Sequence, residues 1–370
     1  MADEPTTSSR RSKLSDQPEQ QPLLPGLPDH LAHLCLALVP PPLLYSVSRS
    51  WRRLLYSPSF PPFLSLYALL SFQNPITNRL DHITFSSYDP ISATWHLLPP
   101  PPPDLPLPSF LLCHTSFIAR CLPIQSVSLS GHLLLLSGTT HGLRPALHRP
   151  LIFHPVSNRW RHGPPIPSPR RWCAAGGAGG AVYMASGIGT DYSPSVARSV
   201  ERWDLVGPAW EKVAPLRDGK FSREAVEAIG LRGKLCMVNV KGNAAKQGVV
   251  YDIGSNRWEE MPQGMLAGWN GPASALDEDV MYVIDEARGA LIEYNGEEDR
   301  WREILQLEAL KGAVQIDAGG GRVCIVCAGG TRIAVAAVVE RPARMWFVDP
   351  PPGTRAVAVH VLPRMSMVES

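Results

Sequence analysis

Short apolar runs alternate with polar turns over most of the chain, and five of these turns follow one pattern. In each, the run ends in an aromatic or acidic residue, a turn follows, and a tryptophan comes next. These tryptophans are Trp95, Trp160, Trp210, Trp258 and Trp301, at spacings of 65, 50, 48 and 43 residues. Self-similarity at roughly 40–50 residues is typical of propeller blades or solenoid units, and strand-rich units favour the propeller. The pattern therefore predicts a mainly β protein built as a β-propeller.

The apolar runs also predict the individual strands. Up to Trp301 they lie at 63–71, 83–90, 94–100, 126–138, 151–155, 178–187, 199–204, 210–215, 234–240, 248–252, 258–262, 279–285, 290–295 and 301–305. Further runs between 313 and 351 include Trp346 in a weaker form of the pattern. The first unit lacks an innermost strand and the run 355–362 is left over, so a blade shared between the termini would close the ring. Six blades are favoured, with five or seven left open.

Residues 23–61 have a different, helical pattern. Pro28 and Asp29 suit a first helical turn. An amphipathic stripe follows at i, i+3, i+4 and i+7, formed by Leu31, Leu34, Cys35 and Leu38. Three prolines at 40–42 end this helix, and a second apolar helix runs from Leu43 through Trp51 and Leu55 until Pro58. A unit of this size is too small to build a self-sufficient core, so we expect it to lean on a partner.

Composition and charge narrow the class of protein. Hydrophobic residues make up 44% and charged residues 18% of the 370, and the net charge is +2. These values predict a folded, soluble chain, and we expect no nucleic-acid or membrane partner. Seven scattered cysteines and a polar N-terminus favour reduced thiols in the cytoplasm or nucleus. The predicted domains are a disordered tail at 1–22, the helical unit at 23–61, the propeller at 62–364 and a short tail at 365–370.

The helical unit resembles an F-box. The family pattern is matched in order and spacing by Leu27-Pro28, Val39-Pro40, Val47-Ser48-Arg49-Ser50-Trp51-Arg52 and Ser57-Pro58-Ser59-Phe60. Ser48 and Arg49 replace the family's commoner Cys and Lys. With the tryptophan-marked repeats behind it, the chain resembles the plant-type F-box/kelch-repeat proteins over most of residues 23–364. The repeats are degenerate, because the glycine pairs usual in kelch blades are clear only at 176–177, 179–180, 319–320 and 329–330.

This resemblance implies a non-catalytic substrate-recognition subunit of an SCF-type E3 ubiquitin ligase. Its partners would be a Skp-type adaptor, through it a cullin–RING ligase, and an unknown target protein. The residues implied in the F-box core or its adaptor contact are Leu27, Pro28, Leu31, Cys35, Leu36, Val39, Pro40, Leu43, Val47, Trp51 and Leu54. The loops at 139–150, 187–198, 216–224 and 263–274 are expected to reach the target. Alternatives are a propeller scaffold or ligand-binding module with the helices as a cap, and a metal-dependent propeller enzyme.

Motifs for other chemistry are weak, and we expect no cofactor, metal or catalytic residue. The eleven histidines form no local metal-binding motif, and the glycine-rich segments lack a complete phosphate-loop pattern. Cys324 and Cys327 have the spacing of a zinc half-site. They lie in a predicted strand, where residues three apart face opposite sides, so buried thiols are favoured. The five repeated tryptophans are expected to pack blade against blade rather than to stack on a ligand.

Overall fold

The computed structural model describes residues 22–57, 59–61, 63–73, 80–105, 107, 110–111, 124–223, 225–241 and 245–365. The predicted N-terminal tail, apart from Pro22, and the helix-ending Pro58 lie outside these residues. The chain divides into two compact units, one up to Pro61 and one from Pro62 onward. Among the described residues, no helix is both long and apolar enough to cross a membrane.

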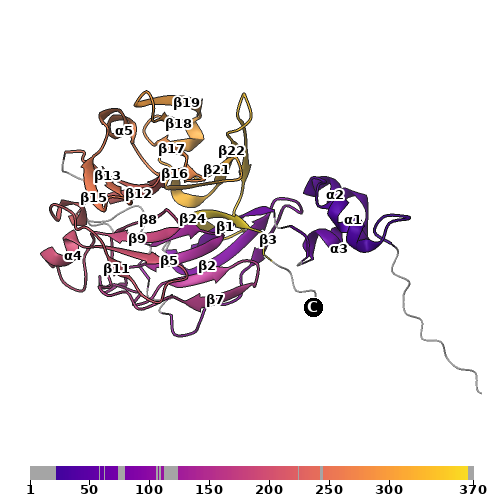
Figure 1. Cartoon of the computed structure of the whole chain (residues 1–370), viewed down its shortest axis with the longest axis horizontal. Coiled ribbons are helices and arrows are strands. Elements are labelled where there is room, and N and C mark those ends of the chain that lie inside the picture. The colour runs from indigo at the N-terminus through magenta and orange to yellow at the C-terminus, as the bar shows by residue number, and fades with distance from the viewer. Residues whose placement is uncertain are drawn as a thin grey trace, which may run out of the picture. The chain divides into compact units, whose positions relative to one another are not determined.

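The first unit contains three helices where the sequence pattern predicted two. They are α1 (Asp29–Leu36), α2 (Pro41–Val47) and α3 (Arg49–Tyr56) (Figure 1). Pro41 occupies the first turn of α2, where its missing N–H is not needed, so the proline run begins a helix as well as ending one. The predicted second helix breaks at Ser48, whose backbone is extended. Its hydroxyl accepts the Trp51 backbone N–H and caps α3.

The second unit is a propeller of six four-stranded antiparallel sheets, which confirms the predicted fold and the favoured blade number (Figure 1). Blade 1 contains β24 (Thr354–Pro363), β1 (Leu64–Gln73), β2 (Leu80–Asp89) and β3 (Thr94–Leu97); blade 2 contains β4 (Gln125–Leu129), β5 (His132–Ser137), β6 (Leu151–His154) and β7 (Arg159–His162). Blade 3 contains β8 (Ala174–Ala178), β9 (Ala181–Ala185), β10 (Val200–Asp204) and β11 (Glu211–Lys212); blade 4 contains β12 (Ala225–Leu231), β13 (Lys234–Lys241), β14 (Gly248–Asp252) and β15 (Arg257–Glu260). Blade 5 contains β16 (Ala273–Leu276), β17 (Val280–Asp285), β18 (Ala290–Asn295) and β19 (Arg300–Gln306); blade 6 contains β20 (Gln315–Gly319), β21 (Arg322–Val326), β22 (Ile333–Ala337) and β23 (Arg344–Val348). Short helices in the connecting loops are α4 (Pro194–Arg198), η2 (Lys220–Arg223), α5 (Gln263–Gly268), η3 (Glu308–Leu310) and η4 (Ala328–Gly330).

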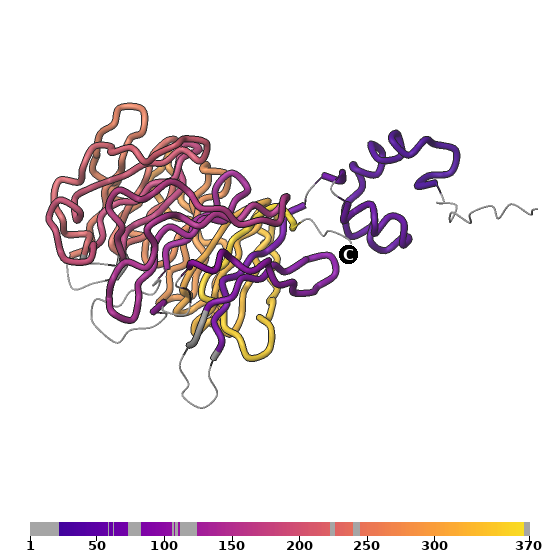
Figure 2. Tube along the Cα trace, turned by 90° about the horizontal axis from the view of Figure 1, so that it is seen from below, coloured from indigo at the N-terminus to yellow at the C-terminus, as the bar shows by residue number. Residues whose placement is uncertain are grey.

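The ring closes as predicted, because the last strand of the chain completes the first blade. Strand β24 lies beside β1 and pairs with it in antiparallel register, with Leu66 opposite Val361 (Figures 1 and 2). The Tyr67 hydroxyl also donates to the Pro363 carbonyl at 2.8 Å. Because the first and last parts of the propeller share one sheet, blade 1 forms only when both ends of the chain are in place.

The innermost strands of three middle blades, β8, β12 and β16, were not predicted from the sequence. They contain many small residues, which weakens the strand signal. The small residues have a packing reason where β8 and β12 meet. A Cβ atom on Gly230 would lie 2.1 Å from the Gly177 carbonyl oxygen, so only glycine allows this close backbone approach.

The five repeated tryptophans join each blade to the one before it. Each ring lies opposite an aromatic residue of the adjacent strand, with ring centroids 4.8–5.7 Å apart; these partners are Tyr88, Phe153, Trp203, Tyr251 and Tyr294. Each indole N–H donates to a backbone carbonyl that follows the preceding blade: Asp349 for Trp95, Pro99 for Trp160, Pro164 for Trp210, Ala214 for Trp258 and Gly264 for Trp301. The bond from Trp95 to Asp349 spans the closure between blades 1 and 6.

Trp346 has the repeat spacing but a different environment. It pairs with Val335, which packs against Leu66 and Ala68 of blade 1, the blade that follows. In the other blades the corresponding pair faces the blade that precedes. Trp346 is 39% exposed, and the Arg322 guanidinium lies 5.9 Å from its ring centroid. The weaker signature around Trp346 therefore reflects a shift of the aromatic residue to the other face of the sheet.

Replacing Trp258 with phenylalanine is expected to lower the free energy of unfolding by about 1–2 kcal/mol, because the Ala214 carbonyl loses its donor and the packed ring shrinks. Trp346→Phe is the matched control, and we expect a change within about 0.5 kcal/mol because its ring is more exposed. Urea unfolding of both variants measures the difference. Equal losses would contradict the packing role assigned to Trp258.

Candidate interaction surfaces

The three helices bury a small set of apolar side chains against one another. On α1 these are Ala32 and Leu36, spaced i, i+4, so they share one helical face. The other buried apolar side chains of the unit are Leu44, Leu54, Leu55 and Phe60. The Trp51 indole N–H donates to the Leu23 carbonyl at 2.8 Å, which fixes the segment before α1 to α3. This core uses less than half of the large apolar residues between Leu23 and Phe60.

Six other large apolar side chains of this unit are exposed, and we name them the apolar face. It consists of Leu27, Leu31, Leu34, Leu38, Leu43 and Val47, with exposed fractions from 38% at Leu27 to 86% at Leu38. The first four repeat at helical spacing along α1 and its ends, and the last two are i, i+4 on α2. Folded proteins rarely leave so many large apolar side chains in water unless they meet a partner. The predicted amphipathic stripe therefore lies on the solvent-exposed side of α1. The buried side of α1 is formed by Ala32 and Leu36 instead.

The predicted adaptor-binding residues divide into two groups in the structure. Seven are exposed: Leu27, Pro28, Leu31, Cys35, Pro40, Leu43 and Val47. Val39 and Trp51 are half-buried, while Leu36 and Leu54 lie in the core. Leu34 and Leu38 were in the predicted stripe but not in the predicted contact set, although they are among the most exposed residues of the apolar face.

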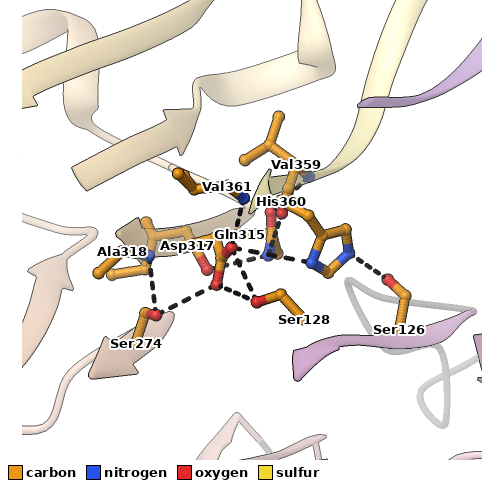
Figure 3. A network of polar contacts seen from close by, with 10 residues as sticks. Ser126, Ser128, Ser274, Gln315, Asp317, Ala318, Val359, His360 and Val361 are labelled. Carbon is orange, nitrogen blue, oxygen red and sulfur yellow. Dashed lines mark hydrogen bonds and ion pairs between the residues drawn. The ribbon is translucent and has the colours of Figure 1, made fainter. Parts of the chain in front are cut away.

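The innermost strands of the propeller surround a cavity. This cavity of about 460 Å³ lies between β4, β8, β12, β16, β20 and β24. Asp317 of β20 is the centre of a hydrogen-bond network in its wall (Figure 3). Its carboxylate accepts the Val361 backbone N–H at 2.7 Å and the Ser128 hydroxyl at 3.0 Å, with the Ser274 hydroxyl at 3.4 Å. The network joins β4, β16, β20 and β24, so it ties together strands on both sides of the ring closure.

His360 of β24 extends the same network. Its Nε2 lies 2.8 Å from the Ser126 hydroxyl, and its Nδ1 faces the Asp317 carboxylate at 3.9 Å (Figure 3). The order Ser–His–Asp is that of a hydrolase triad, but 3.9 Å exceeds a hydrogen bond. Burial lowers the pKa of His360 to about 3 and raises the pKa of Asp317 to about 7. A neutral imidazole and a carboxyl group held by several donors fit a cross-link between strands.

The stability contribution of Asp317 is expected to fall as pH rises. Its pKa is about 7 when folded and about 3.9 when unfolded, so the folded state binds the proton more tightly between these values. Relative to Asp317→Asn, the wild type should therefore lose a few kcal/mol of unfolding free energy between about pH 4 and pH 7, at about 1.4 kcal/mol for each unit of pKa shift. Denaturant unfolding of both proteins across this range tests it, and a constant difference would contradict the raised pKa.

One rim of the propeller holds all four loops predicted to reach a target. In each antiparallel blade, the connection between the second and third strands leaves at the same end as the connection to the next blade. The predicted loops are two connections of the first kind, after β5 and β9, and two of the second kind, after β11 and β15. We name this end the long-loop rim. Position 224 of the predicted loop 216–224 lies outside the described residues.

A buried ion pair anchors the long-loop rim at blade 3. The Arg170 guanidinium lies 2.7 Å from the Glu201 carboxylate of β10, and both side chains are fully buried. Arg170 also donates to the Ser186 carbonyl at 3.2 Å and the Ser199 hydroxyl at 2.8 Å, at the two ends of the β9–β10 loop. Burial raises the pKa of Glu201 in spite of the guanidinium beside it. Nothing in the repeat pattern singled out this pair.

The two cysteines with zinc-site spacing lie buried on opposite faces of blade 6. Cys324 packs with blade 1 residues and Cys327 with blade 5 residues, which confirms that the two thiols face opposite sides of the sheet. Burial raises the pKa of Cys324 to about 12. Over the part of the chain that the structure describes, no three His, Cys, Asp or Glu side chains gather closely enough to hold a metal ion.

Known proteins resemble this chain in sequence and in fold. The F-box/kelch-repeat protein SKIP25 of Arabidopsis thaliana is 47% identical over 378 aligned residues, covering 99% of this chain and 95% of that protein. The F-box protein AFR of the same plant is 30% identical over 305 residues, covering 77% and 76%. A chain in the crystal structure of the nidogen/laminin complex has a TM-score of 0.51 at 8% identity, covering 83% of this chain and 100% of that one, which is a likeness of fold alone. No protein-family model matches the chain.

Proposed function

The chain belongs to the F-box/kelch-repeat proteins, as its motifs predicted, and from this membership we propose that it is the substrate-recognition subunit of an SCF-type E3 ubiquitin ligase. The helices would bind a Skp-type adaptor and, through it, a cullin–RING ligase, while propeller loops hold a target protein. The chain itself would do no covalent chemistry. Its contribution would be to raise the local concentration of target lysines near the E2 thioester, in the cytoplasm or nucleus.

The observation that supports this proposal most strongly is the apolar face of the helical unit. Its six side chains come from α1, α2 and their flanking residues, within the segment whose motifs resemble an F-box. An amphipathic helical surface of this kind fits a hydrophobic groove on a partner. Each Leu that becomes fully buried on binding stabilises a complex by about 1.5–3 kcal/mol before the cost of association is subtracted.

The proposal is tested by mixing the purified full-length chain with a Skp-type adaptor and its cullin. We expect the chain to co-elute with both proteins in size-exclusion chromatography, and with the adaptor alone when the cullin is left out. Failure to bind any Skp-type adaptor would refute the proposal and favour a propeller scaffold whose helices serve only as a cap. Stoichiometric copper, iron or zinc in the purified protein would instead favour a metal-dependent propeller enzyme.

A further inference from the structure

Four consecutive loops on the long-loop rim form one hydrogen-bonded series across blades 2 and 3. They are the loops at 138–150, 163–173, 186–199 and 213–223. The Ile166 N–H donates to the His148 carbonyl at 2.9 Å, which joins the first loop to the second. Arg171 and Ile188 exchange two backbone bonds of 2.8 and 2.9 Å, which join the second to the third. The Leu216 N–H donates to the Arg198 carbonyl at 2.8 Å, which joins the third to the fourth.

This series of loops has an excess of positive charge. Its two carboxylates are matched by neighbours, because Asp218 lies 3.3 Å from the Lys220 ammonium and Asp191 attracts the Arg171 guanidinium. Arg170 is paired with buried Glu201. Among the side chains that the structure describes in these loops, the arginines left over are Arg144, Arg149, Arg198 and Arg217.

All four of these arginines are exposed, and none lies within ion-pair distance of a carboxylate among the described residues. The Arg198 Nε donates to the Leu216 backbone carbonyl at 3.0 Å, which leaves the rest of its guanidinium for a ligand. We name these four side chains the arginine rim. Arginine, unlike lysine, offers a planar fork of donors that matches carboxylate and phosphate oxygens.

Two turns at the opposite end of the propeller are acidic, and one of their six carboxylates, that of Asp279, is paired with Arg232. These turns contain three consecutive acidic residues at 277–279, between β16 and β17, and three more at 297–299, between β18 and β19. An acidic partner would therefore be attracted to one end of the propeller and repelled by the other, which gives it a preferred orientation. This difference in charge between the two ends cannot be seen in the net charge of the whole chain, which is only +2.

We propose that the arginine rim binds an acidic, peptide-like segment of the target protein. The inference rests on the proposed function for the identity of the partner as a target, but the rim's chemistry can be tested without the adaptor. The anionic groups are carboxylates of Asp and Glu or phosphates of modified Ser and Thr, which share the oxygen geometry that arginine recognises.

The test measures fluorescence anisotropy of short labelled peptides with the full-length protein. One peptide is rich in Asp and Glu, one contains phosphoserines, and one carries Asn and Gln at the same positions. We expect the wild type to bind at least one anionic peptide and to ignore the neutral one. Raising the salt from about 50 to about 200 mM should weaken this binding. Tighter binding of the phosphoserine peptide would identify phosphate as the preferred group, and tighter binding of the other would identify carboxylate.

The variant Arg144→Gln/Arg149→Gln/Arg198→Gln/Arg217→Gln should bind the anionic peptide at least about tenfold more weakly. The matched control replaces four exposed arginines on outer strands, at Arg159, Arg161, Arg257 and Arg300, with glutamine and should stay within about twofold of wild type. Changing the four rim residues to lysine should give intermediate binding, because the charge remains without the fork.

Three outcomes would overturn the inference: no anionic peptide binding by the wild type, equal losses in the rim and control variants, or tighter binding of single-stranded RNA than of any peptide. The rim variant should still bind the Skp-type adaptor as the wild type does, since its substitutions lie in the propeller loops. Failure of peptide binding with intact adaptor binding therefore rejects only the arginine rim. Peptide binding without adaptor binding rejects only the ligase proposal.

Discussion

Replacing Arg170 with leucine is expected to lower the free energy of unfolding of the propeller by about 3–5 kcal/mol. Both side chains of the Arg170–Glu201 pair are fully buried, and the guanidinium and carboxylate lie 2.7 Å apart. Removing the guanidinium leaves a carboxylate in a site whose burial already raises the Glu201 pKa. It also leaves the Ser186 and Ser199 carbonyls without this donor, which loosens both ends of the β9–β10 loop.

The measurement is urea unfolding of the wild type and the variant near neutral pH. Arg232→Leu is the matched control, because Arg232 pairs with Asp279 at 2.8 Å with both side chains more than half exposed, and exposed pairs contribute about 0–1 kcal/mol. The double variant Arg170→Leu/Glu201→Leu should recover part of the loss, since no charge is then left buried alone. A loss for Arg170→Leu no larger than the control's would show that the pair does not anchor the rim.

The propeller architecture could be predicted from the sequence because its repeating unit is marked by a large residue, tryptophan. Five tryptophans pack each blade against the preceding one. Because this packing requires one such residue in each of these blades, the tryptophans recur at a regular spacing among smaller residues. The shared blade was also predictable, because β24 was an apolar run without a partner and the first unit lacked a strand. The inner strands β8, β12 and β16 were missed because close backbone packing there selects Gly and Ala, which have little strand preference.

The polar groups that organise the propeller could not be predicted from spacing. Arg170 and Glu201, like Asp317 and His360, lie on different strands or loops and meet only when the ring is assembled. A weaker signal was present for the second pair, since Asp317 and His360 are polar residues inside otherwise apolar predicted strands. Burying a polar side chain costs free energy unless it forms hydrogen bonds. Such positions therefore predict a buried hydrogen-bond network, but not which residues form it.

For the helical unit, the sequence predicted an apolar stripe but not what that stripe contacts. The stripe of Leu31, Leu34, Cys35 and Leu38 was visible in the sequence, yet periodicity alone does not say whether a stripe packs within the chain or against another protein. In the structure Ala32 and Leu36 fill the core instead, and the stripe stays exposed. The break of the second helix at Ser48 was missed because serine is only mildly unfavourable inside a helix but effective as an N-cap.

The double variant Leu31→Glu/Val47→Glu is expected to weaken binding to the Skp-type adaptor by at least about a hundredfold. The two side chains lie on α1 and α2 and are 41% and 59% exposed, so the substitutions leave the core of the helical unit intact. In a complex, each glutamate would place an unpaired charge in an apolar contact and remove roughly 1.5–3 kcal/mol of apolar burial. Each 1.4 kcal/mol lost corresponds to a tenfold change in Kd.

The matched control is His30→Glu/Ser46→Glu, which adds the same two carboxylates at neighbouring exposed positions outside the apolar face. Thermal unfolding of both variants should match the wild type, which separates loss of docking from loss of folding. By contrast, Leu36→Glu is expected to unfold the helical unit, because Leu36 is 2% exposed.

The proposed function is tested most directly by the Kd between the full-length chain and a Skp-type adaptor, measured by isothermal titration calorimetry for the wild type and both double variants. We predict tight one-to-one binding for the wild type and the His30→Glu/Ser46→Glu control, and a Kd at least about a hundredfold higher for Leu31→Glu/Val47→Glu. Equal affinity of all three proteins, or no binding by the wild type, would contradict the assignment of the apolar face as an adaptor-docking surface.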